Sequence, residues 1–199
     1  MASNPIDLLA LEIHEESVSE ANKNIWSNSK FHELPKLQCN NVGKIGERFI
    51  ERLLVSAGIE TSIDGSKTRK LGGGNGDGVI LGKTVEIKTA QQGCHSNSFQ
   101  HELGENPWNS NYMIFLDITP VFVYITIFKN FTEDIYKSGM KMEPFPTRKV
   151  TWRKGTGAFK LDTTPTICEY NARRGLTIKI TENTTDDDIK SYVSRIMTA

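Results

Sequence analysis

The hydrophobic positions of the chain repeat with two different periods, and each period predicts one kind of element. In residues 43–57 the apolar positions recur at helical spacing, and the stripe consists of Ile45, Phe49, Leu53 and Leu54. Such a stripe predicts an amphipathic helix, which Gly58 is suited to end. Residues 4–25 and 185–197 also predict helices, the second because a Thr-Asp-Asp-Asp run stands at its start.

Short runs rich in β-branched and aromatic residues predict strands. The runs are residues 79–81, 84–89, 112–117, 121–128, 159–161 and 176–180, and a further short strand is expected within 59–70. The polar stretch 91–111 predicts a long connection with a helix around residues 99–103. Helices interspersed with strands predict an α/β fold in which a mixed central sheet is flanked by helices.

Composition agrees with one folded domain. Of the 199 residues 37% are hydrophobic and 24% are charged, which is typical of a globular protein rather than a disordered one. The longest apolar run, residues 121–128, is too short to cross a membrane, and the acidic N-terminal stretch does not resemble a secretory signal. The three cysteines are widely spaced, which favours reduced thiols and a cytoplasmic protein without a membrane partner.

The net charge of zero conceals an asymmetry along the chain. Residues 1–60 contain nine acidic and six basic side chains, whereas residues 137–179 contain ten basic and three acidic ones. A basic segment in a neutral chain is typical of a surface that faces nucleic acid, although it is also compatible with an ordinary solvated surface.

The densest candidate chemistry lies in residues 76–88. Gly82-Lys83 between two β-type runs predicts a two-residue hairpin loop, which would pair Val79 with Glu86 and Asp77 with Lys88. Because side chains alternate along a strand, Asp77, Glu86 and Lys88 are expected on one face. Two carboxylates on a rigid sheet suit Mg²⁺, and a lysine beside them can stabilise the charge that develops at a phosphate group.

This segment resembles the PD-(D/E)xK nuclease motif, which is shared by most type II restriction endonucleases and by archaeal Holliday-junction resolvases. Gly76-Asp77-Gly78-Val79 stands for the first part of the motif, with glycine in place of proline, and Val85-Glu86-Ile87-Lys88 stands for the second. The helix with Gly46-Glu47-Arg48 is similar to the first core helix of that superfamily, so the resemblance covers roughly residues 43–128.

The resemblance implies a restriction-endonuclease-like core, one or two Mg²⁺ ions per site and products with 5′-phosphates. It implies a catalytic set of Asp77, Glu86, Lys88 and Glu47, and metal ligands at Asp77, Glu86, Ile87 and Glu47. Glu51 lies one helical turn from Glu47, so either residue can be the helix carboxylate, and an exposed carboxylate that only pairs with a neighbouring arginine is the alternative.

Residues that suit DNA contacts lie in two further segments. The first is polar and contains Gln91, Asn97, Ser98, Gln100 and His101. The second is basic and contains Arg148, Lys149, Arg153, Lys154, Arg173 and Arg174. Amides, hydroxyls and guanidinium groups are the usual donors to phosphates and base edges, but each segment is equally compatible with a solvated surface.

The chain therefore divides into a helical extension (residues 1–42), the nuclease core (43–130) and a part that completes the domain and reads DNA (131–199). The leading hypothesis is a Mg²⁺-dependent, sequence-specific endonuclease of double-stranded DNA, a type II restriction enzyme. Palindromic cutting would require a homodimer, and a restriction system would include a cognate methyltransferase. The alternatives are a repair or junction-specific nuclease of the same fold and a non-catalytic, nuclease-fold DNA-binding subunit.

Overall fold

The computed structural model describes residues 5–63, 76–104, 110–131, 149–153 and 158–198. The helices are α1 (Pro5–Lys23), the 3-10 helix η1 (Leu34–Lys36), α2 (Cys39–Ser56), α4 (Pro165–Arg173) and α5 (Asp186–Met197). The strands are β1 (Thr61–Ile63), β2 (Gly78–Ile80), β3 (Lys83–Gln91), β4 (Phe99–Gly104), β5 (Tyr112–Ile118), β6 (Val123–Lys129), β7 (Lys149–Arg153), β8 (Ala158–Thr163) and β9 (Thr177–Ile180).

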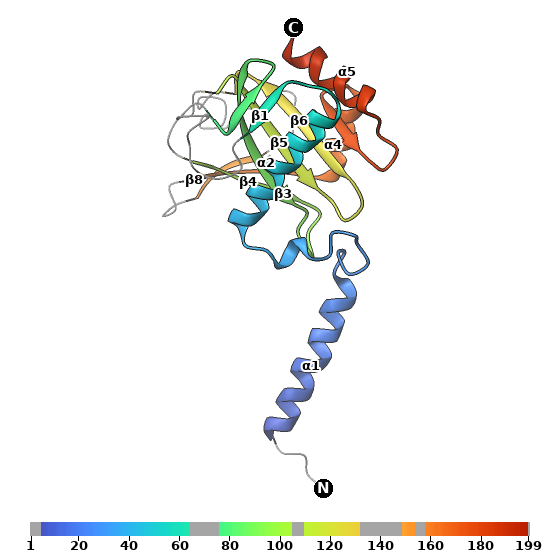
Figure 1. The fold of residues 1–199 in the computed structure, drawn as a ribbon. Helices are drawn as coiled ribbons and strands as arrows, with labels where there is room; N and C mark the ends of the chain where they lie inside the picture. Colours follow the sequence, from blue (N-terminus) through green and yellow to red (C-terminus); the bar gives the residue numbers. More distant parts are fainter. Residues whose placement is uncertain (1–4, 64–75, 105–109, 132–148, 154–157, 199) are drawn as a thin grey trace.

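Six strands form a mixed central sheet in the order β1-β2-β3-β5-β6-β9 (Figure 1). Only the β3–β5 pair is parallel, because the chain returns to the starting end of β3 before β5 begins, and the other neighbours are antiparallel. A second, antiparallel sheet has the order β4-β8-β7. The predicted α/β class, with a mixed central sheet flanked by helices, is confirmed.

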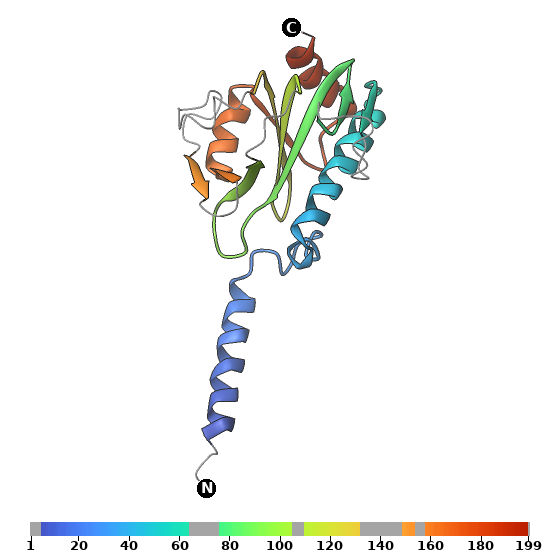
Figure 2. The same cartoon turned by 90° about the vertical axis from the view of Figure 1, so that its left-hand side faces the viewer.

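The two faces of the central sheet are covered by different layers (Figure 2). Helices α2 and α5 lie against one face, and α4 lies with the second sheet against the other. Alternation along β3 sends Val85 and Ile87 into the large apolar core beneath α2, whereas Ala90 belongs to a smaller cluster on the other face.

Helix α2 packs against β3 at Gly46, where the helix has no side chain. A Cβ atom at Gly46 would lie 1.8 Å from the Thr89 Oγ1, so only glycine permits this approach. The fully buried stripe of α2 is Val42, Gly46, Ile50 and Leu54. Of the predicted stripe, Leu54 is buried, whereas Ile45, Phe49 and Leu53 are only half-buried. The helix begins four residues earlier than the predicted Gly43.

The hairpin between β2 and β3 differs from its prediction. Its two loop residues are Leu81 and Gly82, both with positive φ (48° and 72°), as in a type I′ turn. This turn favours glycine at its second position, whereas the predicted Gly82-Lys83 loop put glycine first. The Leu81 amide also donates to the Glu60 carbonyl at 3.0 Å, which helps hold the leucine in this conformation.

Residues 99–103 form a strand, and the predicted helix there is wrong. Phe99, His101 and Leu103 alternate with exposed residues and are buried, which is the period of a strand. Neither β7 nor α4 was predicted from the sequence. The strands of residues 79–81, 84–89, 112–117, 121–128, 159–161 and 176–180 are confirmed within three residues at their ends, as are β1 and the terminal helix, whose Thr185 and Asp188 form a capping box.

Helix α1 extends away from the rest of the molecule, so the N-terminus lies far from the C-terminus (Figure 1). The buried Trp26 anchors the chain just after this helix, since its indole Nε1 donates to the Gln92 carbonyl at 3.0 Å. Within the described part of the chain, no helix combines the length and the apolar character that a membrane crossing needs. Cys39, Cys94 and Cys168 are reduced and form no disulfide bond.

Candidate active site

The hairpin brings Asp77, Glu86 and Lys88 together despite its altered register. Gly78 pairs with Val85, so Asp77 follows in the position opposite Glu86 rather than opposite Lys88. The register is displaced by two residues, and an even displacement leaves every side chain on its predicted face. The three side chains thus share the face that α4 and the second sheet cover.

Asp77 continues the hairpin beyond the end of β2. Its amide donates to the Val85 carbonyl at 2.7 Å, and its Oδ2 accepts a hydrogen bond from the Ile87 amide at 2.7 Å. The carboxylate therefore takes the place that a strand carbonyl would otherwise occupy. These two bonds fix the side chain beside Glu86.

Glu86 and Lys88 form an ion pair on the same strand face, with 2.5 Å between Oε1 and Nζ. Their side chains are 15% and 27% exposed, respectively. The parallel register places Met113 beside Glu86 and Phe115 beside Lys88, so the pair lies on an apolar floor. In such surroundings a charge pair interacts more strongly than it would in bulk water.

The electrostatics of Asp77 resemble those of a cation-binding carboxylate. Burial and the nearby Glu86 carboxylate raise the pKa of Asp77 to about 6, against the opposing effects of the Ile87 amide and the Lys88 ammonium. Two carboxylates that repel each other at a partly desolvated position form a donor set that fits a divalent cation such as Mg²⁺. Ile87 can contribute only a backbone oxygen, because its side chain is apolar and buried.

Glu47 is not gathered with these groups. It lies half-buried on α2, the helix that covers the opposite face of the sheet, and Glu51 on the same flank accepts a hydrogen bond from the Ile63 amide at 3.4 Å. Among the described residues no three His, Cys, Asp or Glu side chains lie close enough to hold one ion. A metal-binding role for Glu47 therefore stays a prediction.

The glycines that flank Asp77 are explained by the packing of the chain itself. A Cβ atom at Gly76, where φ is +115°, would lie 2.2 Å from the Val85 carbonyl oxygen, and one at Gly78 would lie 2.4 Å from that of Ser62. The hairpin could not pair this closely with larger residues. Gly76 and Gly78 are therefore explained by the pairing of the hairpin, without reference to a bound phosphate group.

The first predicted DNA-contacting segment is dispersed by the fold. Alternation places Gln91 on the α2 face, with its Oε1 buried, and Gln91 lies five residues or roughly 16 Å along β3 from Glu86. Asn97 and Ser98 lie in the turn beyond that strand end, with Asn97 exposed and Ser98 half-buried. Gln100 is exposed and donates to Asp162 at 3.3 Å. This end of the sheet is therefore distant from the carboxylates.

The structure corrects the prediction that His101 contacts DNA, because the His101 side chain is completely buried. Its Nε2 lies 2.7 Å from the Asp117 Oδ1, both side chains are 0% exposed, and the imidazole stacks edge-to-face on Phe115 at 5.0 Å. The Cys168 thiol donates to the other Asp117 oxygen at 3.5 Å. In this structure His101 joins β4 to β5 and cannot contact DNA.

The sequence did not predict this buried His101–Asp117–Cys168 group. The signal that could have located it is the alternation of Phe99, His101 and Leu103, which predicts an inward position for the histidine. Nothing in the local sequence of Asp117 or Cys168 indicates that they meet it.

The second predicted DNA-contacting segment is described only in part. Arg148 and Lys154 lie outside the described residues, and the backbones of Lys149 and Arg153 belong to β7 at the edge of the second sheet. Arg173 and Arg174 are exposed at the end of α4, where the Arg174 guanidinium lies over the Tyr170 ring, 5.3 Å from its centroid.

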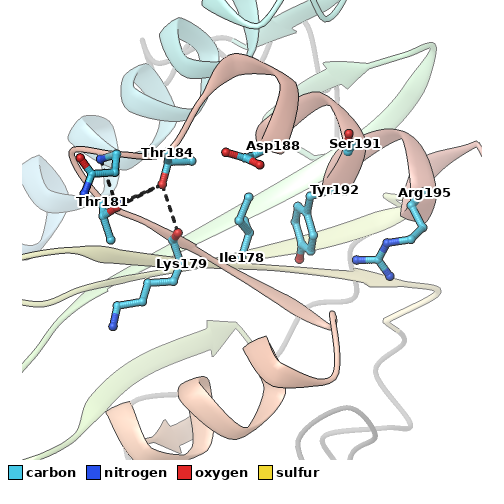
Figure 3. A pocket seen from close by; sticks show the side chains of 9 residues that line it. Ile178, Lys179, Thr181, Thr184, Asp188, Ser191, Tyr192 and Arg195 are labelled. Carbon is cyan, nitrogen blue, oxygen red and sulfur yellow. Dashed lines mark hydrogen bonds between the residues drawn. The ribbon is translucent and has the colours of Figure 1, made fainter.

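One pocket between described elements lies away from the carboxylates. A polar pocket of about 480 Å³ separates β9 from α5 and is lined by Thr181, Thr184, Asp188, Ser191 and Arg195 among others (Figure 3). Thr184 donates there to the Lys179 carbonyl at 3.3 Å, while the Lys179 ammonium extends to Glu169 at 2.6 Å. Strands β5 and β6 lie between this pocket and β3, so it is a separate feature.

The geometry thus provides two carboxylates and a lysine on one face of a rigid hairpin. Comparison of the chain with protein-family models, with curated proteins and with solved structures found no match.

Proposed function

We propose that the protein is a Mg²⁺-dependent endonuclease of double-stranded DNA with a restriction-endonuclease-like core, as the resemblance of its motif implies. The observation that supports this most is the Asp77–Glu86–Lys88 arrangement: two mutually repelling carboxylates beside a lysine on adjacent strands. The repulsion between the two carboxylates disfavours folding unless a cation compensates for it, which makes the pair a candidate functional site.

In this proposal Asp77 and Glu86 would hold the cation, assisted by the backbone oxygen of Ile87. Bound Mg²⁺ would supply Lewis acidity toward the phosphodiester group and toward water. Lys88 would orient the attacking water and stabilise the negative charge on the phosphate oxygens. The Ile87 amide favours the ionised form of Asp77 and aligns the carboxylate with Glu86, since it donates to Oδ2.

A type II restriction enzyme would need two partners, a second copy of the chain and a methyltransferase. Cutting both strands of a palindrome requires two copies related by a two-fold axis, so the active form would be a homodimer. A host that contains it would need a methyltransferase of the same specificity to protect its own DNA.

Cleavage of plasmid DNA tests the activity directly. The purified protein should linearise or fragment a sequenced plasmid with Mg²⁺ and should lose this activity in EDTA. Mapping the fragment ends gives the site and the end chemistry, and discrete fragments with 5′-phosphates are expected. Cleavage that persists in EDTA, or a wild-type protein with no activity, would contradict the proposal, whereas preference for four-way junctions over linear duplex would favour a junction-specific nuclease.

A further inference from the structure

Two neighbouring hollows at one end of the central sheet are lined by basic side chains. The first, about 310 Å³, lies between the β2–β3 hairpin and the end of α5, and the second, about 320 Å³, lies between β6, the end of α4 and α5. They share Lys129. Among the described residues that line them, four are basic and none is acidic, namely Lys83, Lys129, Arg174 and Arg195, which we call the basic end surface.

The fold gathers these four residues from distant parts of the chain. Lys83 begins β3 and Lys129 ends β6, and the registers bring both to the end of the sheet where β5 starts, because Tyr112 pairs with Val85 on one side and with Lys129 on the other. Arg174 follows α4, and Arg195 lies in the last turn of α5. All four side chains are exposed.

Helix termini explain the positions of only two of the four basic residues. The last carbonyls of α4 and α5 carry partial negative charge that favours Arg174 and Arg195. Lys83 and Lys129 lie at strand ends, where no such dipole acts. Both arginines are also partly held in place, since Arg195 donates to the Gly175 carbonyl and Arg174 lies over the Tyr170 ring. A held guanidinium loses less side-chain entropy when it binds an anion.

The basic end surface lies at the hairpin end of the strand that carries Glu86. Lys83 and Glu86 are three residues apart on β3, which corresponds to about 10 Å along the strand. Alternation directs Lys83 and Lys129 to the face beneath α2 and α5 and Glu86 to the other face, so the surface lies around the end of the sheet from the carboxylates. A DNA duplex presents one negative charge per about 1.7 Å of its axis, so a duplex that extends past this end of the sheet from a phosphate at Glu86 offers further phosphates to these cations. The sign and the position of the four cations therefore suit a nucleic-acid backbone.

We propose that the basic end surface binds the phosphate backbone of duplex DNA where the duplex extends past the end of the sheet from the cleavage site, an inference that rests on the proposed nuclease function. In this proposal Lys83, Lys129 and Arg195 hold the DNA backbone in position, although all three lie outside the basic segment 137–179. Arg174 is the one residue of the surface that belongs to that segment. Cations of this kind anchor and orient a duplex without reading its sequence.

Salt-dependent binding tests the surface without requiring cleavage. A labelled duplex of about 25 base pairs carrying the mapped site, or a random sequence if none is mapped, is titrated with the full chain by fluorescence anisotropy between roughly 50 and 200 mM salt. Ca²⁺ replaces Mg²⁺ to suppress cutting. Lys83→Ala/Lys129→Ala should weaken binding about tenfold or more and reduce the slope of log K against log salt by about 2, and adding Arg174→Gln/Arg195→Gln should reduce it by about 2 more.

The matched control is Lys36→Ala/Lys190→Ala, which removes the same charge from exposed lysines outside the two hollows. This control should leave the slope unchanged, and thermal melts of all variants should coincide within a few degrees. Equal slopes for the control and for Lys83→Ala/Lys129→Ala would overturn the proposal, as would a wild-type protein that binds no duplex or binds polyglutamate equally well. A protein that shows the slope difference but never cuts DNA would overturn the nuclease function alone.

Discussion

The two faces of the central sheet bury different chemistry. Beneath α2 and α5 the face is mainly aliphatic, with Val85, Ile87, Ile114 and Leu116 in one cluster. The face beneath α4 and the second sheet carries the buried or half-buried polar groups Glu86, Lys88, Asp117, Thr126 and Thr177. The same strands supply both faces, so each alternate residue of β3 and β5 belongs to a different environment.

The difference separates what stabilises the fold from what equips it for chemistry. An aliphatic face needs only the right volume and shape, and it supplies most of the burial free energy. A buried polar group disfavours folding unless a specific partner compensates for its lost hydration. Thr126 and Thr177 have such a partner in each other at 2.7 Å, and His101 supplies one for Asp117. Glu86 has the Lys88 ammonium and Asp77 has the Ile87 amide as partners, but the two carboxylates also repel each other, and this repulsion is the reason for proposing a cation between them.

Substitution on the polar face of β3 should have the largest effect on activity. Glu86→Gln and Lys88→Ala should each lower the cleavage rate at least about 100-fold, because each removes a charge from the reacting centre, with little change in the melting temperature. The matched controls are Glu102→Gln and Lys160→Ala, which face each other on β4 and β8. Rates within about tenfold of wild type for both active-site variants would remove these residues from the catalytic set.

Breaking the buried pair between the sheets should have the largest effect on stability. His101→Ala should lower the free energy of unfolding by about 3–5 kcal/mol, since the Asp117 carboxylate keeps its burial and loses the imidazole. His95→Ala removes a half-exposed imidazole that lies 3.0 Å from Glu20, and it should cost less than about 1 kcal/mol. Urea denaturation measures both, and similar losses for the two variants would show that burial does not distinguish them.

On the aliphatic face, two glycines of one helix should respond in opposite directions. Gly46→Ala should destabilise the protein by about 1–3 kcal/mol, because its Cβ would overlap the Thr89 side chain. Gly43→Ala meets nothing within 4 Å and should stabilise α2 by about 0.5–1 kcal/mol. Thr89→Ala in the Gly46→Ala background should recover part of the loss; a complete absence of recovery would locate the strain elsewhere.

A modest change in stability is expected from the ionisation of Asp77. Burial and the Glu86 carboxylate raise the pKa of Asp77 from its usual 3.8 to about 6, so its ionisation disfavours folding increasingly as the pH rises between those values and fully above about 6. Asp77→Asn should therefore raise the free energy of unfolding by about 1–2 kcal/mol at pH 7.5 and by almost nothing below pH 4.

Metal provides the control for this variant. Mg²⁺ should stabilise the wild type at pH 7.5, because it binds the folded state, and should leave Asp77→Asn unchanged. A variant that is less stable than wild type at every pH would show that the Ile87 hydrogen bond outweighs the repulsion from Glu86.

Local sequence predicted the elements whose periods are unambiguous. Helix α2, which ends just before Gly58, the strands on either side of Pro120 and the N-terminus of α5 could all be predicted, because propensity, periodicity and capping act over a few neighbouring residues. The helix predicted at residues 99–103 failed because β4 is stabilised by pairing with β8, which lies about sixty residues away.

For the site, the sequence by itself determined that Asp77, Glu86 and Lys88 share one face. Side-chain alternation has a period of two, and an error of two residues in the hairpin register does not change it. Only the tertiary structure decided that Asp77 lies opposite Glu86, that His101 turns inward to Asp117, and that Lys83, Lys129, Arg174 and Arg195 gather at one end of the sheet. Those outcomes depend on which distant segments pack together, and contacts of that kind are selected by the shape and burial of the whole domain rather than by neighbouring residues.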